Sequence, residues 1–265
     1  MAGRLVVCPT PIGNLEDVTL RTLAALRDAD VVACEDTRRT RVLVDRFGVK
    51  AHLVSYHEHN EDARARELVE RMRAGETVAL VSDSGMPLVS DPGFVLVREC
   101  VAAGLAVEVL PGPSAVITAL VASGLPSSSW RFVGFLPRKQ GELRSVLAAP
   151  ETIVAFESPR RLAASLRAAD PEREVAVCRE LTKVHEEVVR GTAGSLAARY
   201  ADSPPKGEIV VVLAPLGDSD ARRDEATAAT KELISAGARP RVAARVVAGL
   251  TGASANELYR ASLGS

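Results

Sequence analysis

Side chains able to take up or orient a proton follow several of the apolar runs in this chain. The candidates are Glu35, Asp36, His57, Glu58, His59, Lys183, His185 and Glu186. By its intrinsic pKa, His57 is the better-suited proton acceptor, because imidazole titrates near neutral pH. Lys183 beside another positive charge would have a lowered pKa, or would simply bind phosphate. We take His57, Lys183 and Glu186 as the catalytic candidates, while Glu35 and Asp36 serve equally well as caps of the helix that follows them.

The stretch at residues 82–94, SDSGMPLVSDPGF, contains two aspartates, two glycines and two prolines. It lies between a buried strand expected at 78–81 and a helix expected at 93–103. Similar turns follow the strands expected at 5–8 and 106–110, with the sequences PTPIGN and PGPS. Because open α/β sheets bind ligands where their strands end, we expect these loops to form a cleft along one edge of a sheet.

The first half of the chain alternates between strand and helix patterns, which predicts βαβ units and a mostly parallel sheet. Between the loops, strands are expected at 31–34 and 51–55, and helices at 19–27, 39–47, 60–74 and 114–122. Glycines at 48 and 75 stop two of these helices. The run GLPSSS at 124–129 is a change in composition that marks a domain boundary.

The second half predicts another α/β unit, with strands at 131–136, 152–156, 174–178 and 208–213 and a helix at 142–149. Three helical segments follow at 221–235, 242–248 and 255–263, and the turn LTGAS joins the last two. This spacing suits a helix-turn-helix, and nucleic-acid recognition and simple packing explain it equally well. The fold class is therefore α/β: an N-terminal domain at 1–126, a second α/β domain at 127–216 and a helical segment at 217–265.

Composition and charge exclude several classes of protein. The 265 residues are 47% hydrophobic and 25% charged, as in ordinary globular proteins. There is no apolar run of the roughly 20 residues needed to span a bilayer, and MAGRLVVCPT lacks the h-region of a signal peptide, so we expect a cytosolic protein. A net charge of -1 argues against a protein that coats naked nucleic acid.

The sequence also lacks the common metal and nucleotide motifs. The four cysteines, Cys8, Cys34, Cys100 and Cys178, are widely spaced and have no CxxC pairing, which favours reduced core residues over a zinc site. Neither the dinucleotide glycine fingerprint nor the phosphate-binding P-loop sequence is present, and no HExxH helix occurs. We therefore expect no metal.

A set of longer segments resembles one known family. The segments, in chain order, are PTPIGNLEDVTLRTL, ACEDTRRTRVL, SYHEHNE, ALVSDSGMPLVSDPGF, LPGPSAVITALVASGLP, FVGFLPRK, FESPRRL, RELTKVHEE and KGEIVVVL. Together they resemble the ribosomal RNA small-subunit methyltransferase I family over residues 5–213. The resemblance implies two α/β domains of the tetrapyrrole-methylase type, S-adenosylmethionine in an interdomain cleft, and a homodimer. It also implies 2'-O-methylation of a cytidine in the decoding region of 16S rRNA, within the small ribosomal subunit.

The same resemblance assigns the cofactor-binding residues. They are Pro11, Ile12, Asp83, Gly85, Met86, Pro87, Ser114 and Ala115 in the first domain, and Phe156, Leu181, Thr182, Ala214 and Pro215 in the second. Gly85 and Pro87 also serve as turn formers, and core packing explains Phe156 and Leu181 equally well. The chain departs from the family pattern at Met86 and Leu88, where the family has Thr and Gly, and at Arg160, where ESPHR becomes ESPRR. No catalytic role passes to Arg160, because a guanidinium cannot accept a proton.

Arginine and lysine residues beside the motif loops are the expected RNA contacts: Arg38, Arg39, Arg41, Arg138, Lys139, Arg160 and Arg161. Singly, each suits a solvated surface, whereas clustered near one cleft they favour phosphate contact. Because the net charge is near zero, the expected substrate is an assembled ribosomal particle. Two alternatives stay open: a methyltransferase of the same fold acting on a tetrapyrrole or a modified protein residue, and a non-catalytic RNA-binding assembly factor.

Overall fold

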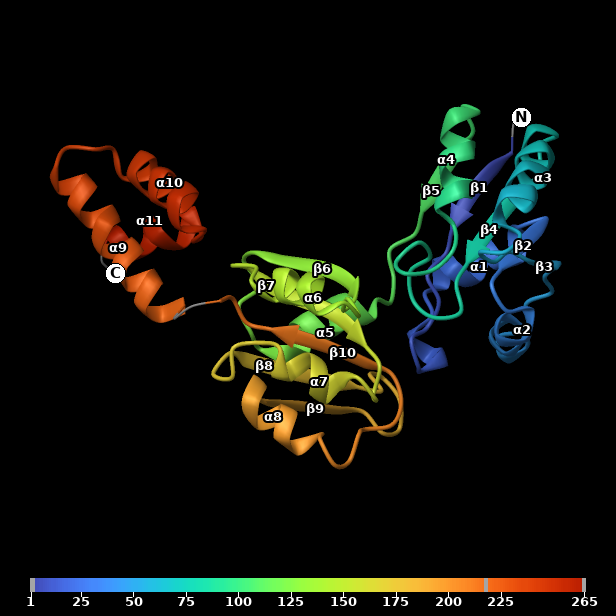
Figure 1. Cartoon of the computed structure of the whole chain (residues 1–265). Coiled ribbons are helices and arrows are strands. Elements are labelled where there is room, and N and C mark those ends of the chain that lie inside the picture. Colours follow the sequence, from blue (N-terminus) through green and yellow to red (C-terminus); the bar gives the residue numbers. More distant parts are fainter. Residues whose placement is uncertain (1–2, 217–218, 264–265) are drawn as a thin grey trace. The chain divides into compact units, whose positions relative to one another are not determined.

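A computed structural model describes residues 3–216 and 219–263. Within it the chain forms two compact units (Figure 1). The first comprises Met1–Thr118 and Leu181–Val184, and the second comprises Ala119–Glu180 and His185–Ser265. The first unit thus takes up a short stretch of chain that follows much of the second. The expected division into three parts, with boundaries after residues 126 and 216, stays a prediction.

The first unit contains a fully parallel sheet with the strand order β3-β2-β4-β1-β5, which confirms the βαβ prediction. Its strands are β1 (Arg4–Val7), β2 (Val31–Cys34), β3 (Leu53–Ser55), β4 (Thr77–Val81) and β5 (Ala106–Val109). Its helices are η1 (Leu15–Asp17), α1 (Leu20–Asp28), α2 (Thr37–Arg46), α3 (Glu61–Arg73) and α4 (Phe94–Ala102). The helix α5 (Ala115–Ser123) begins in the first unit and ends in the second.

Helices cover both faces of this sheet, because the central strands are apolar on both sides. One face packs against α3 and α4 through residues such as Leu68 and Leu96. The other packs against α1 and α2 through residues such as Leu26 and Leu43. Strands buried on both faces are typical of parallel sheets, and their direction brings every carboxyl end to one edge. The four cysteines are buried, as the sequence predicts.

The second unit contains a mixed sheet with the strand order β6-β7-β10-β8-β9. Its strands are β6 (Trp130–Phe135), β7 (Thr152–Glu157), β8 (Glu174–Arg179), β9 (Glu187–Thr192) and β10 (Ile209–Leu213). The helices α6 (Gln140–Leu147), α7 (Leu162–Arg167) and α8 (Ala193–Arg199) pack on one face around an apolar core. Only β6 and β7 are parallel, since β10 and β9 run against their neighbours.

Three elements of the second unit go beyond the sequence-based prediction. The helices α7 and α8 have six and seven residues, too few to give a clear helical period. The strand β9, EVVRGT, is a half-exposed edge strand that carries two charged residues, so its apolar pattern is weak. Because β9 went unrecognised, the reversal of strand direction beyond β7 also went unrecognised.

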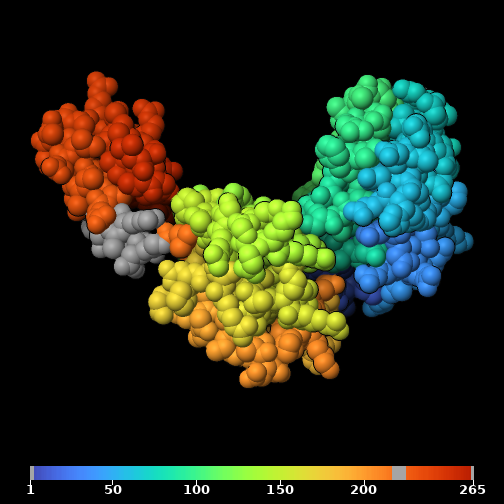
Figure 2. All heavy atoms as spheres, viewed as in Figure 1, coloured from blue at the N-terminus to red at the C-terminus, as the bar shows by residue number. Residues whose placement is uncertain are grey.

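The C-terminal helices pack on one another. They are α9 (Ser219–Ser235), α10 (Pro240–Thr251) and α11 (Ala255–Leu263), which confirms three helical segments in this part of the chain. Their common core includes Ala226, Val247 and Leu258. Gly252 takes the left-handed conformation, with φ 75°, that turns α10 into α11. The three helices contact one another, and their described side chains run from orange to red in Figure 2.

Among the described residues, no helix combines the length and apolar character that crossing a bilayer requires.

Candidate functional site

The three loops singled out in the sequence leave three neighbouring strands. In the first sheet β1 lies between β4 and β5 and pairs with both in parallel register. The loops at 8–14, 82–93 and 110–114 therefore emerge from the same edge of the sheet, as the sequence predicts. This carboxyl edge is where open α/β sheets bind ligands.

Backbone hydrogen bonds join the first two loops. The amide of Thr10 donates to the carbonyl of Gly85 at 2.8 Å, and the amide of Gly85 donates to the carbonyl of Thr10 at 3.0 Å. The hydroxyl of Thr10 donates to the carbonyl of Ser82 at 3.1 Å, and the hydroxyl of Ser82 donates to the carbonyl of Gly85 at 3.1 Å. The three bonds of Thr10 fix the two loops against each other, and the bond from Ser82 to Gly85 stabilises the turn after β4, so that the edge is preorganised.

Gly85 meets two separate requirements at this edge. Its φ of 81° lies in the left-handed region, which costs a residue with a side chain roughly 1–2 kcal/mol. A Cβ there would also stand 3.3 Å from Cγ2 of Ile12 and 3.7 Å from the carbonyl oxygen of Pro113. The absence of a side chain therefore lets all three loops approach one another at this point. Their backbone polar groups and the apolar side chain of Ile12 are of the kinds that a cofactor with an amino acid and an adenosine would need.

Residues 181–183 lie against the loop that follows β1. A Cβ on Gly13 would stand 2.4 Å from Cγ of Lys183, 2.8 Å from Oγ1 of Thr182 and 2.9 Å from the carbonyl oxygen of Leu181. Thr182 has a φ of 66°, a backbone conformation that residues with a side chain rarely adopt. The structure therefore brings three of the predicted site residues, Leu181, Thr182 and Lys183, beside Ile12.

Asp83 joins the loop after β4 to the loop after β2. Its Oδ1 accepts a hydrogen bond from the amide of Asp36 at 2.9 Å, and its Oδ2 lies 3.5 Å from Nε of Arg39. The side chain of Asp36 caps α2 by accepting from the amide of Arg38 at 2.8 Å. The helix-capping alternative is thus confirmed for Asp36.

Two carboxyl groups near Asp83 have raised pKa values. Partial burial raises the pKa of Glu35, and the negative charges of Asp83 and Glu58 add to this, against an opposing effect of Arg39. Burial and the charge of Glu35 raise the pKa of Asp91 to about 6. Titratable groups perturbed in this way are common at functional sites. Asp91 was recognised in the sequence only as part of the loop, because its burial beside Glu35 depends on the pairing of β2 with β4.

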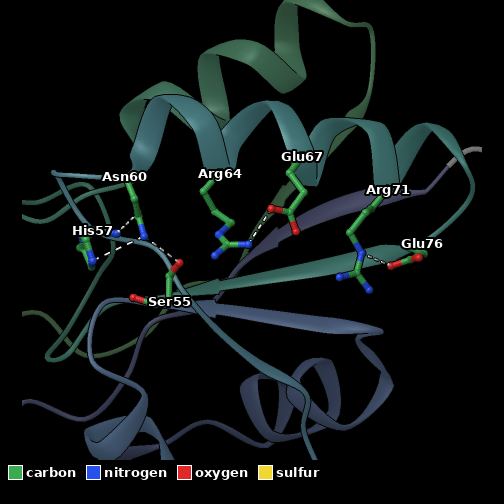
Figure 3. Close-up of polar contacts among 7 residues, drawn as sticks. All are labelled: Ser55, His57, Asn60, Arg64, Glu67, Arg71 and Glu76. Carbon is green, nitrogen blue, oxygen red and sulfur yellow. Dashed lines mark hydrogen bonds and ion pairs between the residues drawn. The ribbon is translucent and has the colours of Figure 1, made fainter.

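The ring of His57 is held by Asn60 at the beginning of α3 (Figure 3). Oδ1 of Asn60 accepts from the amide of His57 at 2.8 Å, and Nδ2 of Asn60 donates to the carbonyl of Ser55 at 3.2 Å. Nδ2 also lies 3.4 Å from Nε2 of His57. If Asn60 donates there, the neutral ring carries its proton on Nδ1, which is buried and has no hydrogen-bond partner among the described residues. Asn60 therefore orients the ring but competes for the nitrogen that would accept a proton.

Two of the catalytic candidates, His57 and Lys183, lie beside different strands of the first sheet. His57 follows β3, and Lys183 lies against the loop after β1, three strand positions away, or about 14 Å at the usual strand spacing. Glu186 is exposed and directly precedes β9 in the second unit.

The second sheet separates two parts of the predicted cofactor set. Phe156 pairs with Val210, whereas Ala214 follows Leu213, which pairs with Ile153. Ala214 and Pro215 therefore lie at the opposite end of the sheet from Phe156, about 13 Å along the strands. The separation arises because β10 runs antiparallel to β7, and a shared role of these residues in binding the cofactor stays a prediction. The carbonyl of Ala214 accepts from Nε of the buried Arg173 at 2.6 Å.

Phe156 itself sits in an aromatic group at its end of the sheet. Its ring lies 5.1 Å from that of Phe132 and 5.5 Å from that of Phe135, measured between centroids. Phe135 is 60% exposed, so the group presents an apolar aromatic surface. Either role foreseen for Phe156, core packing or a wall for a ligand, is consistent with this position.

Most of the predicted RNA contacts are exposed. On the first unit these are Arg38, Arg39 and Arg41 of α2, and on the second they are Arg138, Lys139 and Arg160. Arg161 differs, since its guanidinium is bound within the protein: its NH2 nitrogen donates to the carbonyls of Leu136 and Pro137 at 2.8 and 2.9 Å.

Comparison with known proteins identifies the family. The model of the family described as "Tetrapyrrole (Corrin/Porphyrin) Methylases" matches residues 4–197. Ribosomal RNA small subunit methyltransferase I from Mesorhizobium japonicum is 47% identical over 97% of this chain and 90% of its own length. The protein of that name from Mycobacterium tuberculosis is 46% identical over 100% of this chain and 96% of its own length. The chain belongs to the ribosomal RNA small subunit methyltransferase I family of tetrapyrrole methylases.

A solved structure agrees on the fold of this family. Uroporphyrin-III C-methyltransferase from Thermus thermophilus, crystallised with S-adenosyl homocysteine, matches 80% of this chain and 97% of its own with a TM-score of 0.57. At 22% identity this likeness concerns the fold alone. S-adenosylmethionine is the methyl donor of the family.

Proposed function

We propose that this enzyme methylates the 2'-hydroxyl of a cytidine in the decoding region of 16S rRNA, with S-adenosylmethionine as methyl donor and the small ribosomal subunit as substrate. The observation that carries the proposal is near-full-length similarity, at 46–47% identity, to proteins named ribosomal RNA small subunit methyltransferase I. We extend the proposal to a homodimer that acts in the cytoplasm, where its ribosomal substrate is.

The carboxyl edge of the first sheet, around Gly85, is the proposed cofactor site. Gly85 and Ile12 supply a small apolar surface, and the loops around them supply backbone polar groups. The proposed contacts are Pro11, Ile12, Asp83, Gly85, Met86, Pro87, Ser114, Ala115, Leu181 and Thr182, with Phe156 from the second unit. Ala214 and Pro215, which follow β10 at the other end of the second sheet from Phe156, complete the proposed set.

The proposed reaction is a displacement at the methyl carbon. The bound donor supplies an electrophilic methyl group on a positively charged sulfur. The 2'-oxygen forms a bond to that carbon, the carbon–sulfur bond breaks with its electron pair going to sulfur, and the hydroxyl proton passes to an acceptor. The protein must hold oxygen, carbon and sulfur in line and exclude water, which is mainly a task of positioning.

Lys183 is the proposed first choice for the group that handles this proton or binds the adjacent phosphate. Its Cγ lies against Gly13, beside the proposed cofactor contact Ile12. His57 is the second choice, since Asn60 occupies one ring nitrogen. Glu186, at the beginning of β9, is the third.

The proposed RNA-binding surface uses exposed arginines and lysines that flank the motif loops. With a net charge of -1, the chain lacks the excess of positive charge that binding to free RNA requires. Recognition of an assembled particle, where shape and several phosphate contacts add, is the better match. The cytidine has to leave its stack so that its ribose reaches the methyl group.

The test is a methylation assay with labelled S-adenosylmethionine and small subunits that lack the modification. The expected product is a single labelled cytidine whose 3' phosphodiester resists alkaline hydrolysis, because a 2'-O-methyl group blocks cleavage there. Deproteinised 16S rRNA serves as the comparison and is expected to react poorly. Label on a base, on ribosomal protein or on an added tetrapyrrole would overturn the proposed substrate. Absence of cofactor binding in calorimetry would favour a non-catalytic assembly factor.

A further inference from the structure

Arg161 joins two loops of the second unit. Its NH2 nitrogen donates to the carbonyls of Leu136 and Pro137 at 2.8 and 2.9 Å, and lies 3.3 Å from Oε2 of Glu157. Its side chain is 29% exposed. Leu136 and Pro137 follow β6, whereas Glu157 ends β7, so one guanidinium connects the ends of two strands.

Glu157 is a rigid anchor for this arginine. Its side chain is fully buried, with 0% exposure, and its oxygens accept from the amide of Ser158 at 2.7 Å and from the hydroxyl of Ser165. A buried carboxylate is costly unless hydrogen bonds and a positive charge compensate it. Here both are present, so the position of Arg161 is tightly determined.

The segment that Arg161 holds carries positively charged side chains. Leu136 makes the last ladder bond of β6, from its amide to the carbonyl of Phe156 at 3.0 Å, and the next residue, Pro137, has no amide hydrogen to donate. Arg138 is one residue beyond Pro137, and Arg160 is one residue before Arg161, each a single Cα step of about 3.8 Å. Arg138, Lys139 and Arg160 are exposed.

We propose that Arg161 is a positioning residue that holds the loops at 136–139 and 158–161 together, so that Arg138, Lys139 and Arg160 bind rRNA phosphates as one surface. This rests on the proposed function. Arginine suits the task because its planar, weakly hydrated guanidinium is preorganised for such contacts, whereas the ammonium of lysine is strongly hydrated and ends a flexible stem. The exposed ion pair of Lys139 with Glu142, at 3.1 Å, is weak enough to yield to a phosphate.

The first test is Arg161→Lys, which keeps the charge beside Glu157. The KM for small subunits is expected to rise about five- to tenfold, with kcat and the Kd for S-adenosylmethionine unchanged. Amide hydrogen exchange in residues 136–141 is expected to accelerate in the free protein. The matched control is Arg131→Lys, which alters an ion pair to Glu151, at 2.9 Å, at the other end of β6. This control should change neither the KM for small subunits nor the amide exchange rates in residues 136–141.

A double-mutant cycle with Arg138→Ala distinguishes positioning from direct contact. If Arg161 acts through the loop, the KM of the double variant rises by less than the product of the two single effects. If the effects multiply and exchange in 136–141 is unchanged, Arg161 contacts RNA independently and the proposal is overturned. Should Arg161→Lys fail to fold, Ser165→Ala serves in its place, because it removes one hydrogen bond to Glu157. It is expected to raise the KM and the exchange rates in residues 136–141, by less than Arg161→Lys would.

Failure of the proposed function is seen separately. If the wild-type protein does not methylate small subunits, the RNA-binding part of the inference falls with it. The exchange rates of Arg161→Lys then still decide whether Arg161 holds the 136–139 segment.

Discussion

Gly13 lies directly against Lys183: a Cβ at residue 13 would stand 2.4 Å from Cγ of Lys183. The same Cβ would approach the carbonyl oxygen of Leu181 to 2.9 Å, a backbone atom that cannot move aside alone. A loop at the carboxyl edge of the first sheet is thus shaped to receive a distant part of the chain.

Gly13→Ala is expected to push residues 181–183 away from the loop. Overpacking of this kind costs about 1–3 kcal/mol, and we expect calorimetry to find weaker S-adenosylmethionine binding together with a lower Tm. Gly249→Ala in α10 is the control, since a Cβ there meets nothing within 4 Å and alanine favours helix. Unchanged cofactor affinity in Gly13→Ala would remove the 181–183 segment from the site.

Gly85→Ala, compared with Gly104→Ala, separates the effect of backbone strain from the effect of a side chain that fills space at the proposed cofactor site. Gly85 and Gly104 have φ values of 81° and 68°, so alanine at either position should lower the free energy of unfolding by about 1 kcal/mol. Only Gly85 has Ile12 and Pro113 within reach, whereas Gly104 has nothing within 4 Å. We therefore expect cofactor affinity to fall about tenfold or more in Gly85→Ala and to stay unchanged in Gly104→Ala. Equal affinities would place the cofactor elsewhere.

Asp91→Asn is expected to stabilise the protein in a pH-dependent way. Burial raises the pKa of Asp91 from 3.8 to about 6, so the folded state disfavours its charged form. Stability is therefore lost as pH rises from about 4 to about 6, and asparagine avoids that loss. Solvent screening reduces the gain at pH 7.5 to about 1 kcal/mol, and at pH 4 no gain is expected. Urea unfolding at both pH values measures the free energy of unfolding, with Asp45→Asn on the exposed face of α2 as control. A higher free energy of unfolding for Asp91→Asn at pH 4 would contradict the prediction.

His57→Asn tests the second candidate proton acceptor. Because Lys183 is the first choice, we expect kcat and the Kd for S-adenosylmethionine to stay close to their wild-type values, whereas loss of a general base would lower kcat about 10²- to 10⁴-fold. His52→Asn, at an exposed histidine before β3, should leave both constants unaffected. If kcat is retained in His57→Asn, the ring has a structural role only, and Lys183 remains the candidate.

The first half of the fold follows from its sequence because each strand there runs in the same direction. Apolar runs buried on both faces indicate parallel strands, and parallel strands put every following loop at one edge. The grouping of the loops near Thr10, Ser82 and Pro113 was therefore predictable. The raised pKa of Asp91 was not, because it depends on which strands are neighbours, and β4 inserts between β1 and β2.

The second half shows where such reasoning fails. Strand direction there depends on β9, a half-exposed edge strand with a weak pattern. The role of Arg161 was equally hidden, since a charged residue before a short helix gives no sign that its guanidinium binds the carbonyls of Leu136 and Pro137.

The inclusion of Leu181–Val184 in the first unit has a consequence for synthesis of the protein. The stretch that contacts Gly13 leaves the ribosome roughly 170 residues after it, on the order of ten to thirty seconds at bacterial elongation rates. The nascent N-terminal sheet can form early, but its carboxyl edge lacks residues 181–184 until the later strands have been made. A fragment ending at Thr118 would therefore lack the stretch that contacts Gly13, so we expect methylation only once translation has passed Val184.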